Sequence, residues 1–328
     1  EFGLQYNYQM RPEFLRTMAS ASWSYKWTQR QKIQHRIDLI NIGFLYLPRI
    51  SEKFKEDFIN KGQSHILQYN YQDRLIINMG YSYHYNSIGG AIVNNTIASN
   101  SYSIRFNFES AGNIMYALSK ATNIRKNNDG EYAILGIPYA QYVKGEFDFS
   151  KNIRIDHRNS FAFHVGLGIA PYGNAKTIPF EKQYFSGGAN SVRGWTVRDL
   201  GPGSFVRTKN TNLLDQSGDI KLDASIEYRS KLFWKFQGAI FVDAGNIWTI
   251  RDYDNQPGGV FKFDKFYKQI AVAYGLGLRL DLDFFILRFN GGMKALNPVY
   301  ESGKDRYPII HPKFSRDFAF HFAVGYPF

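Results

Sequence analysis

The sequence predicts an all-β protein that crosses a membrane as an antiparallel β-barrel. Three observations support this prediction: large apolar residues alternate with small or polar ones over many segments, aromatic residues make up 17% of the chain, and charged residues interrupt every apolar run. Alternation with a period of two gives a strand one apolar and one polar face. Tyr and Phe favour both strands and membrane interfaces.

The segment 161–169 shows the alternation most clearly. We predict that its odd positions face lipid and that His164, Gly166 and Gly168 face the barrel interior; the odd positions are Phe161, Phe163, Val165, Leu167 and Ile169. Similar segments include 75–85, 102–109, 220–229, 270–282 and 318–328. A soluble β-sandwich also alternates, but its strands average about five or six residues. Roughly eleven to thirteen segments are present here, most of about ten residues or more, the length that a membrane-spanning strand needs.

Composition argues against several other classes of protein. No apolar stretch approaches the ~20 residues that a membrane helix needs. The net charge is +12, but the basic residues are scattered and form no recognition helix, so no nucleic-acid partner is expected. The chain has no cysteine, and its seven histidines are dispersed, so neither a metal nor another cofactor is expected.

No catalytic residue is predicted. The glycine-rich run 187–194 lacks the Gly-Lys-Ser/Thr ending of a phosphate-binding loop. No Ser, His and acid group can be assembled from the sequence either. An outer-membrane enzyme therefore remains only a minor alternative, and we expect a protein that is not an enzyme.

The connections between the segments divide into short and long ones, as in outer-membrane barrels. Short turns are expected at 10–12 and 156–159, long excursions at 111–136, 171–218 and 249–265, and an amphipathic helix, with Ser51 as its N-cap, at 51–61. We read residues 1–328 as one domain. Because the sequence opens inside an alternating run, 2–8, and shows no signal peptide, a leader and further structure are expected upstream.

Three motifs follow one another along the second half of the chain. The loop 171–218 contains Val192-Arg193-Gly194-Trp195, a later segment contains Phe241-Val242-Asp243-Ala244-Gly245, and the sequence ends on Tyr326-Pro327-Phe328. This ordered set resembles the BamA/TamA superfamily of outer-membrane assembly proteins, and within it the TamA-like (TamL) proteins of Bacteroidetes. The motifs span about 150 residues, whereas the upstream region matches only in its general strand pattern.

The resemblance implies an antiparallel transmembrane barrel of sixteen strands, five of which follow the loop. The five candidates begin at Ile220, Gly238, Ile270, Phe284 and Phe318. Counting back places the segment 2–8 near the fourth strand. The first strands and the periplasmic POTRA domains would then lie upstream, so the barrel domain would be incomplete at its N-terminus.

Strand parity and the resemblance together suggest an ion pair inside the barrel. If Ile240 and Val242 face outward, Phe241 and Asp243 face inward, and Glu227 does so by the same rule. In the family the loop folds back into the barrel, which implies that Arg193 meets Asp243 and Glu227. The planar guanidinium suits this role because it can bind carboxylates in a bidentate manner. The alternative is that Arg193 is a solvated loop charge.

The implied function is assembly or translocation of proteins at the bacterial outer membrane, without a cofactor. The implied partners are unfolded or exported protein substrates, outer-membrane lipids and lipopolysaccharide, and a periplasmic partner that is either TamB-like or one of the Bam lipoproteins. Two other functions remain open: a housekeeping BamA insertase and a passive or secretion pore.

The predicted last strand, 318–328, indicates how such a protein would open. Phe322 belongs to its lipid-facing row, together with Tyr326 and Phe328. Pro327 has no N–H to donate and Gly325 adds backbone freedom, so the end of the strand pairs poorly. A weak seam between the last and first strands would offer an edge to a substrate strand.

Overall fold

The computed structural model of the protein describes residues 1–10, 14–50, 72–88, 100–127, 130–173, 177–207, 213–282 and 284–325. Twelve strands form one antiparallel sheet in the order β1-β2-β3-β4-β5-β8-β9-β10-β11-β12-β13-β14. The short strands β6 (Ala133–Ile134) and β7 (Ile137–Pro138) form a separate hairpin. Among the described helices, none is both long enough and apolar enough to pass through a membrane.

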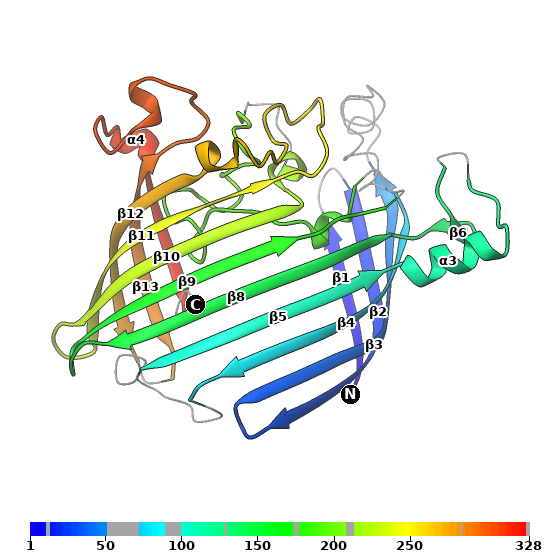
Figure 1. Ribbon diagram of the computed structural model, residues 1–328, viewed down its shortest axis with the longest axis horizontal. Coiled ribbons are helices and arrows are strands. Elements are labelled where there is room, and N and C mark those ends of the chain that lie inside the picture. The colour runs from blue at the N-terminus through cyan, green and yellow to red at the C-terminus, as the bar shows by residue number, and fades with distance from the viewer. Residues whose placement is uncertain are drawn as a thin grey trace.

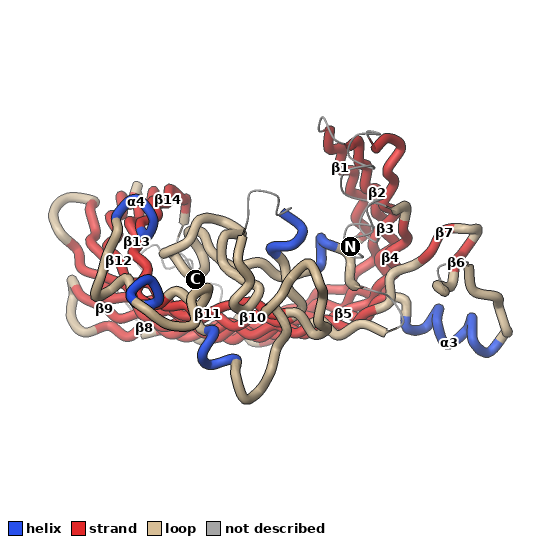
Figure 2. The backbone as a smooth tube through the Cα atoms, turned by 90° about the horizontal axis from the view of Figure 1, so that it is seen from above, coloured by secondary structure: helices blue, strands red, loops and turns tan. Residues whose placement is uncertain are grey.

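The sheet is strongly curved, and the connection between β9 and β10 lies on its concave side (Figures 1 and 2). Its strands are β1 (Phe2–Met10), β2 (Phe14–Gln29), β3 (Ile33–Ile50), β4 (Arg74–Asn86), β5 (Ser101–Ala111), β8 (Tyr142–Arg154), β9 (Asn159–Ile169), β10 (Ile220–Lys231), β11 (Phe236–Trp248), β12 (Ala271–Asp281), β13 (Ile286–Leu296) and β14 (Phe318–Val324). Two α-helices are described, α3 (Asn113–Ala121) and α4 (Phe314–Asp317). The described 3₁₀ turns are η3 (Phe180–Lys182), η4 (Leu213–Gln216), η5 (Phe266–Gln269) and η6 (Lys304–Arg306). β1 and β14 are the two edges of the sheet, and in the described residues they do not pair with each other.

The predicted strand count and the predicted five strands after the long loop are confirmed. These five are β10 to β14, and two of them, β10 and β14, begin at the predicted residues. Seven strands of the main sheet precede the loop, so a sixteen-stranded count that ends at β14 places β1 fifth and not fourth. The predicted helix at 51–61 lies outside the described residues.

From β5 onward, long and short connections alternate along the sheet. Short turns at 30–32, 155–158 and 232–235 join strands at one end, whereas long segments at 112–141, 170–219 and 249–270 join them at the other. Sequence reasoning missed a further long connection, 297–317, which contains η6 and α4. The turn predicted at 10–12 belongs to the end with the long connections, because it joins β1 to β2; residues 11–13 themselves are outside the described ranges.

Exposure along β9 follows the predicted parity. Phe161, Val165, Leu167 and Ile169 are exposed on the convex side, and Phe163 is half-buried. Ala162, Gly166 and Gly168 are buried on the concave side. The apolar row is therefore available to lipid, and the small residues make room for the loop on the other face.

Val165→Lys is expected to lower the free energy of unfolding by about 2–4 kcal/mol, because it places a cation in the lipid near the middle of the strand. His164→Lys is the matched control. The imidazole of His164 lies 3.4 Å from a carboxylate oxygen of Asp148 and 3.5 Å from one of Asp223, so a cation there has partners. Denaturant unfolding in lipid vesicles measures both changes. Equal losses for the two variants would show that the faces are assigned wrongly.

Candidate functional site

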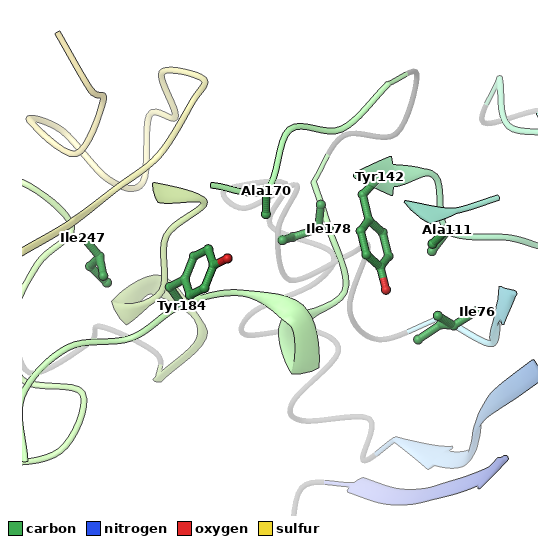
Figure 3. Packing of buried hydrophobic residues seen from close by; sticks show 8 residues of the cluster. Ile76, Ala111, Tyr142, Ala170, Ile178, Tyr184 and Ile247 are labelled. Carbon is green, nitrogen blue, oxygen red and sulfur yellow. The ribbon is translucent and has the colours of Figure 1, made fainter. Parts of the chain in front are cut away.

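The connection between β9 and β10 comprises residues 170–219, and its described parts, 170–173, 177–207 and 213–219, fold back over the concave face of the sheet (Figures 1 and 2). At its base, near the strand ends, Ala170, Ile178 and Tyr184 pack with Ile247 of β11 in an apolar cluster (Figure 3). The backbone of Tyr184 exchanges two hydrogen bonds with Gly218, of 2.8 and 2.9 Å. We call this connection the interior loop.

A buried carboxylate fixes the return of the interior loop to β10. Asp219 is fully buried, its Oδ2 accepts a hydrogen bond of 3.0 Å from the backbone N–H of Ile250, and its own N–H donates to Trp248. Burial raises the pKa of the Asp219 carboxyl to about 6, because removal from water disfavours the charged form.

Two glycines shape the turn before the tip of the interior loop. Gly187 and Gly188 both have left-handed backbone conformations, with φ of 91° and 98°. A Cβ on Gly187 would lie 2.2 Å from the carbonyl oxygen of Thr196, so a side chain does not fit there. The N–H of Gly188 donates to the carbonyl of Trp195, 2.9 Å away, and closes the turn.

The tip itself packs against small residues of the sheet. Val192 and Trp195 are buried with Ala271 and Ala273 of β12. A Cβ on Gly194 would lie 2.7 Å from the Cβ of Ala273. On β13, a Cβ on Gly292 would lie 2.1 Å from the carbonyl oxygen of Arg193. The backbone of the tip therefore lies directly on the sheet, with no space for larger residues.

Arg193 forms both expected ion pairs. Its Nε donates to Asp243 Oδ2 at 2.8 Å, Nη2 donates to Asp243 Oδ1 at 2.7 Å, and Nη1 donates to Glu227 Oε2 at 2.7 Å. Ser225, directly opposite Asp243 in the β10–β11 register, accepts from Arg193 and donates to Asp243. Arg193, Asp243 and Glu227 are each at most 1% exposed. The planar guanidinium thus holds two strands and the loop tip together.

An aromatic ring and two glycines also pack closely around this ion pair. The guanidinium of Arg193 lies over the ring of Phe241, with 3.5 Å between the guanidinium carbon and the ring centre, a cation–π contact. A Cβ on Gly275 would lie 2.4 Å from the same ring. A Cβ on Gly245 would lie 2.4 Å from the carbonyl oxygen of Leu222. Each residue of the Phe-x-Asp-x-Gly motif therefore has a distinct role. Phe241 packs against the guanidinium, Asp243 binds it, and Gly245 allows β10 and β11 to approach closely.

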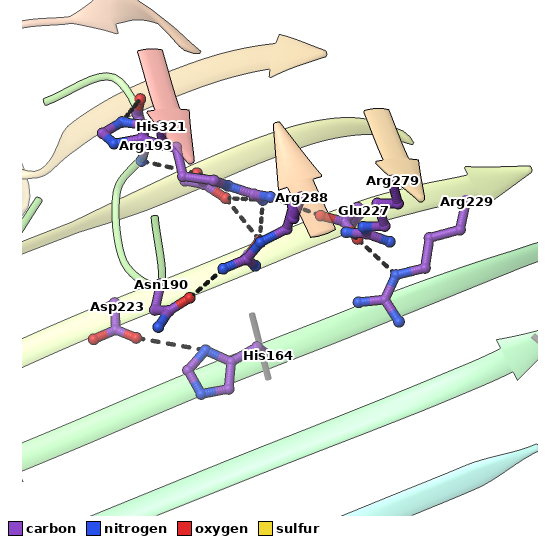
Figure 4. Close-up of polar contacts among 11 residues, drawn as sticks. His164, Asn190, Arg193, Asp223, Glu227, Arg229, Arg279, Arg288 and His321 are labelled. Carbon is purple, nitrogen blue, oxygen red and sulfur yellow. Dashed lines mark hydrogen bonds and ion pairs between the residues drawn. The ribbon is translucent and has the colours of Figure 1, made fainter. Parts of the chain in front are cut away.

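Sequence reasoning missed three further arginines that converge on this site (Figure 4). Arg229 donates to Glu227 at 2.6 Å, and Arg279 of β12 also bonds to Glu227. Arg288 of β13 bonds to Asn190 of the interior loop. Together with Arg193 they make four cations around the two carboxylates of Glu227 and Asp243, an excess of two positive charges.

The last described strand also contacts the tip of the loop. His321 of β14 forms a hydrogen bond of 2.9 Å from its Nε2 to the backbone carbonyl of Arg193, so this ring nitrogen is the donor (Figure 4). His321 is 7% exposed. The loop that is anchored to β10 and β11 is therefore also joined to β14, at the edge of the sheet.

β14 ends earlier than the sequence predicts. The predicted strand 318–328 is observed only over Phe318–Val324, and Gly325 follows with φ of 89°, a conformation that interrupts the strand. Phe320, Phe322 and Val324 are exposed on the outer face as expected. Tyr326, Pro327 and Phe328 lie outside the described residues.

The curved antiparallel sheet, with an interior loop that buried charges anchor to its concave face, has the architecture of an outer-membrane β-barrel. The model of the Omp85 superfamily domain matches residues 2–328, and the chain belongs to this superfamily.

Relatives of known structure have the same fold. BamA from Haemophilus ducreyi lacking POTRA domains 1–3 superposes with a TM-score of 0.60 at 17% identity, over 95% of this chain and 55% of that chain. CdiB from Escherichia coli superposes with a TM-score of 0.51 at 12% identity, over 95% of this chain and 45% of that one.

A sequence relative is the outer membrane protein assembly factor BamA of Neisseria meningitidis serogroup B, which is 33% identical over 99 residues. That match covers 27% of this chain and 12% of the relative. The chain thus corresponds to about half of each similar structure and to a small part of this relative.

Proposed function

We propose that this chain is the barrel of a factor that assembles or translocates other proteins at the outer membrane. Membership of the Omp85 superfamily supports the general class. The main support for the proposal is the interior loop. Arg193 anchors its tip on the concave face of the sheet, where a passive pore would keep an open passage.

The proposed mechanism is lateral opening at the edge formed by β14. Among the described residues β14 spans seven positions, whereas β9 to β13 span between eleven and thirteen, so this part of β14 offers fewer positions for main-chain hydrogen bonds. A short edge strand is easier to displace, and a substrate strand could add to the freed edge by β-augmentation. The hydrogen bond from His321 to Arg193 would couple this movement to the interior loop.

We further propose that the protein is TamA-like and works with a TamB-like periplasmic partner, with the housekeeping BamA insertase and its lipoproteins as the alternative. No cofactor and no catalytic residue enters this mechanism, since strand exchange makes and breaks hydrogen bonds alone. The substrate would be an unfolded barrel protein or an exported surface protein.

The test is to compare conductance with assembly in the full-length protein. In planar bilayers we expect a mainly closed protein, and in proteoliposomes we expect it to accelerate folding of an unfolded outer-membrane barrel. Arg193→Ala should open the passage more often, because it releases the tip of the loop. A steady, large conductance in the unaltered protein, without any acceleration of substrate folding, would favour the passive pore and overturn the proposal.

A further inference from the structure

The segment after β5 presents an exposed apolar surface that the proposed assembly mechanism does not use. α3 begins two residues after β5 ends at Ala111. In both Figure 1 and Figure 2 it projects beyond the end of the sheet, apart from the loops on the concave side. The position of α3 along the membrane normal is thus set by the end of β5, a membrane-spanning strand.

The start of α3 is held rigidly against two strands. Gly112 has φ of 65°, and a Cβ there would lie 2.1 Å from the carbonyl oxygen of Ala140. Asn113 Nδ2 donates to the carbonyl of Tyr142 at 2.9 Å and to Ser110 Oγ at 3.0 Å. The helix therefore leaves the end of β5 in a fixed direction beside the start of β8.

α3 buries one face against the rest of its own connection. Ser119 is 4% exposed and lies within hydrogen-bond distance of the Tyr139 hydroxyl, at 3.2 Å. The ring of Tyr116 meets that of Tyr132 edge to face, with 5.5 Å between the ring centres. The connection thus supports the helix from one side only.

The opposite face of α3 is apolar and exposed. Ile114 and Leu118 are 54% and 53% exposed, and Ala117 and Ala121 complete the stripe at helical spacing. Ile124, just after the helix, is 48% exposed. A single exposed leucine needs no explanation, but an apolar stripe along a whole helix does.

Two observations identify what covers this stripe. The outward row of β5, which includes Tyr102, Phe106 and Phe108, is exposed on the convex side and ends at Phe108, four residues before the connection begins. The helix contains no acidic residue, and the exposed cations Lys120, Arg125 and Lys126 lie within or just after it. An apolar stripe beside basic residues is typical of a helix that lies in the interface of an anionic membrane.

Because the long connections of outer-membrane barrels lie at their extracellular end, we propose that α3, which belongs to the long connection 112–141, lies in the outer leaflet, with Ile114 and Leu118 among the acyl chains. The phosphate groups of lipopolysaccharide are the partners of Lys120, Arg125 and Lys126. This contact would fix the rim of the barrel beside β5 and β8 to the leaflet, on the side of the sheet away from β14. It does not depend on the proposed assembly activity.

Spin labels attached to cysteines provide the test, since the chain has no cysteine of its own. The full-length protein with Leu118→Cys, and separately with Ile114→Cys, is reconstituted in phosphatidylcholine liposomes with and without lipopolysaccharide. Accessibility of the label to oxygen and to a water-soluble nickel complex reports its depth. Phe106→Cys serves as the lipid-facing control, and Lys304→Cys in the exposed η6 turn serves as the water-facing control.

The readout is the ratio of the label's accessibility to oxygen to its accessibility to the nickel complex. We expect this ratio at 114 and 118 to resemble that at 106 and to lie several-fold above that at 304. Lipopolysaccharide should raise it further. Combined Lys120→Gln, Arg125→Gln and Lys126→Gln should remove the additional rise and leave the signal in phosphatidylcholine. A ratio at 118 equal to that at 304 in both membranes would overturn the proposal. Protection of 118 from both reagents, which indicates a protein cover, would overturn it as well, and a lipid-facing ratio unaffected by lipopolysaccharide would overturn the phosphate contact.

Discussion

Arg193→Ala is expected to lower the free energy of unfolding by about 3–5 kcal/mol and to impair substrate assembly, because it removes one partner of a buried ion pair. In the described residues, Asp243 would then keep as hydrogen-bond donors only the Ser225 hydroxyl and the backbone N–H of residue 193, which lies 3.0 Å from its Oδ2. Glu227 retains its ion pairs with Arg229 and Arg279. Most of the lost stability should therefore come from the carboxylate of Asp243, which loses its cation. Denaturant unfolding in lipid vesicles measures the change in stability, and limited proteolysis within 177–207 measures release of the loop.

The matched control is Arg207→Ala in the same loop. The ion pair of Arg207 with Asp199 spans 3.0 Å, but the arginine side chain is 56% exposed. Exposed pairs contribute about 0–1 kcal/mol, so this variant should unfold almost as the unaltered protein does. If Arg193→Ala costs no more than Arg207→Ala, the anchor described for the interior loop is wrong.

Exchanging the two charges tests the same contact without removing it. Arg193→Asp combined with Asp243→Arg should recover part of the stability lost by either change alone, because the opposite charges again face each other. Recovery should be incomplete, since the new aspartate at 193 would lie close to Glu227. Strictly additive losses would mean that Arg193 and Asp243 do not interact.

Strand faces could be predicted from the sequence because parity is a local property. Alternation in 161–169 and 220–229 placed Glu227 and the small residues of β9 inward without any knowledge of neighbouring strands. The ends of strands were less predictable. β14 stops at Val324 because the backbone of Gly325 turns into the left-handed region, and alternation alone does not show where a glycine will interrupt a strand.

The arginine cluster shows what parity cannot predict. Arg279 and Arg288 lie on the inward faces of β12 and β13; alternation was predicted for the segment 270–282, which contains Arg279, whereas the segment of Arg288 was predicted only as a strand that begins at Phe284. Their convergence on Glu227 and Asn190 depends on the stagger between strands and on the path of the loop, which are tertiary properties. The same holds for His321, whose partner is a backbone carbonyl 128 positions away in the sequence.

Locking the edge of β14 to the strand that closes the barrel is expected to abolish substrate assembly while the protein remains folded in the membrane. A disulfide there would hold the seam shut, so no substrate strand could pair with the freed edge. One cysteine replaces Ala323 of β14, and the other is placed opposite it on the closing strand of the full-length protein.

A second disulfide, between Phe289→Cys and Phe322→Cys, provides the control. These two residues are partners in the β13–β14 register, so this bridge joins strands that are already paired and leaves the seam free.

The decisive measurement is the rate at which an unfolded outer-membrane barrel folds in proteoliposomes that contain each crosslinked protein, before and after reduction. If the barrel opens laterally, only the seam bridge stops assembly, and reduction restores it. Full assembly activity with the seam demonstrably crosslinked would contradict lateral opening.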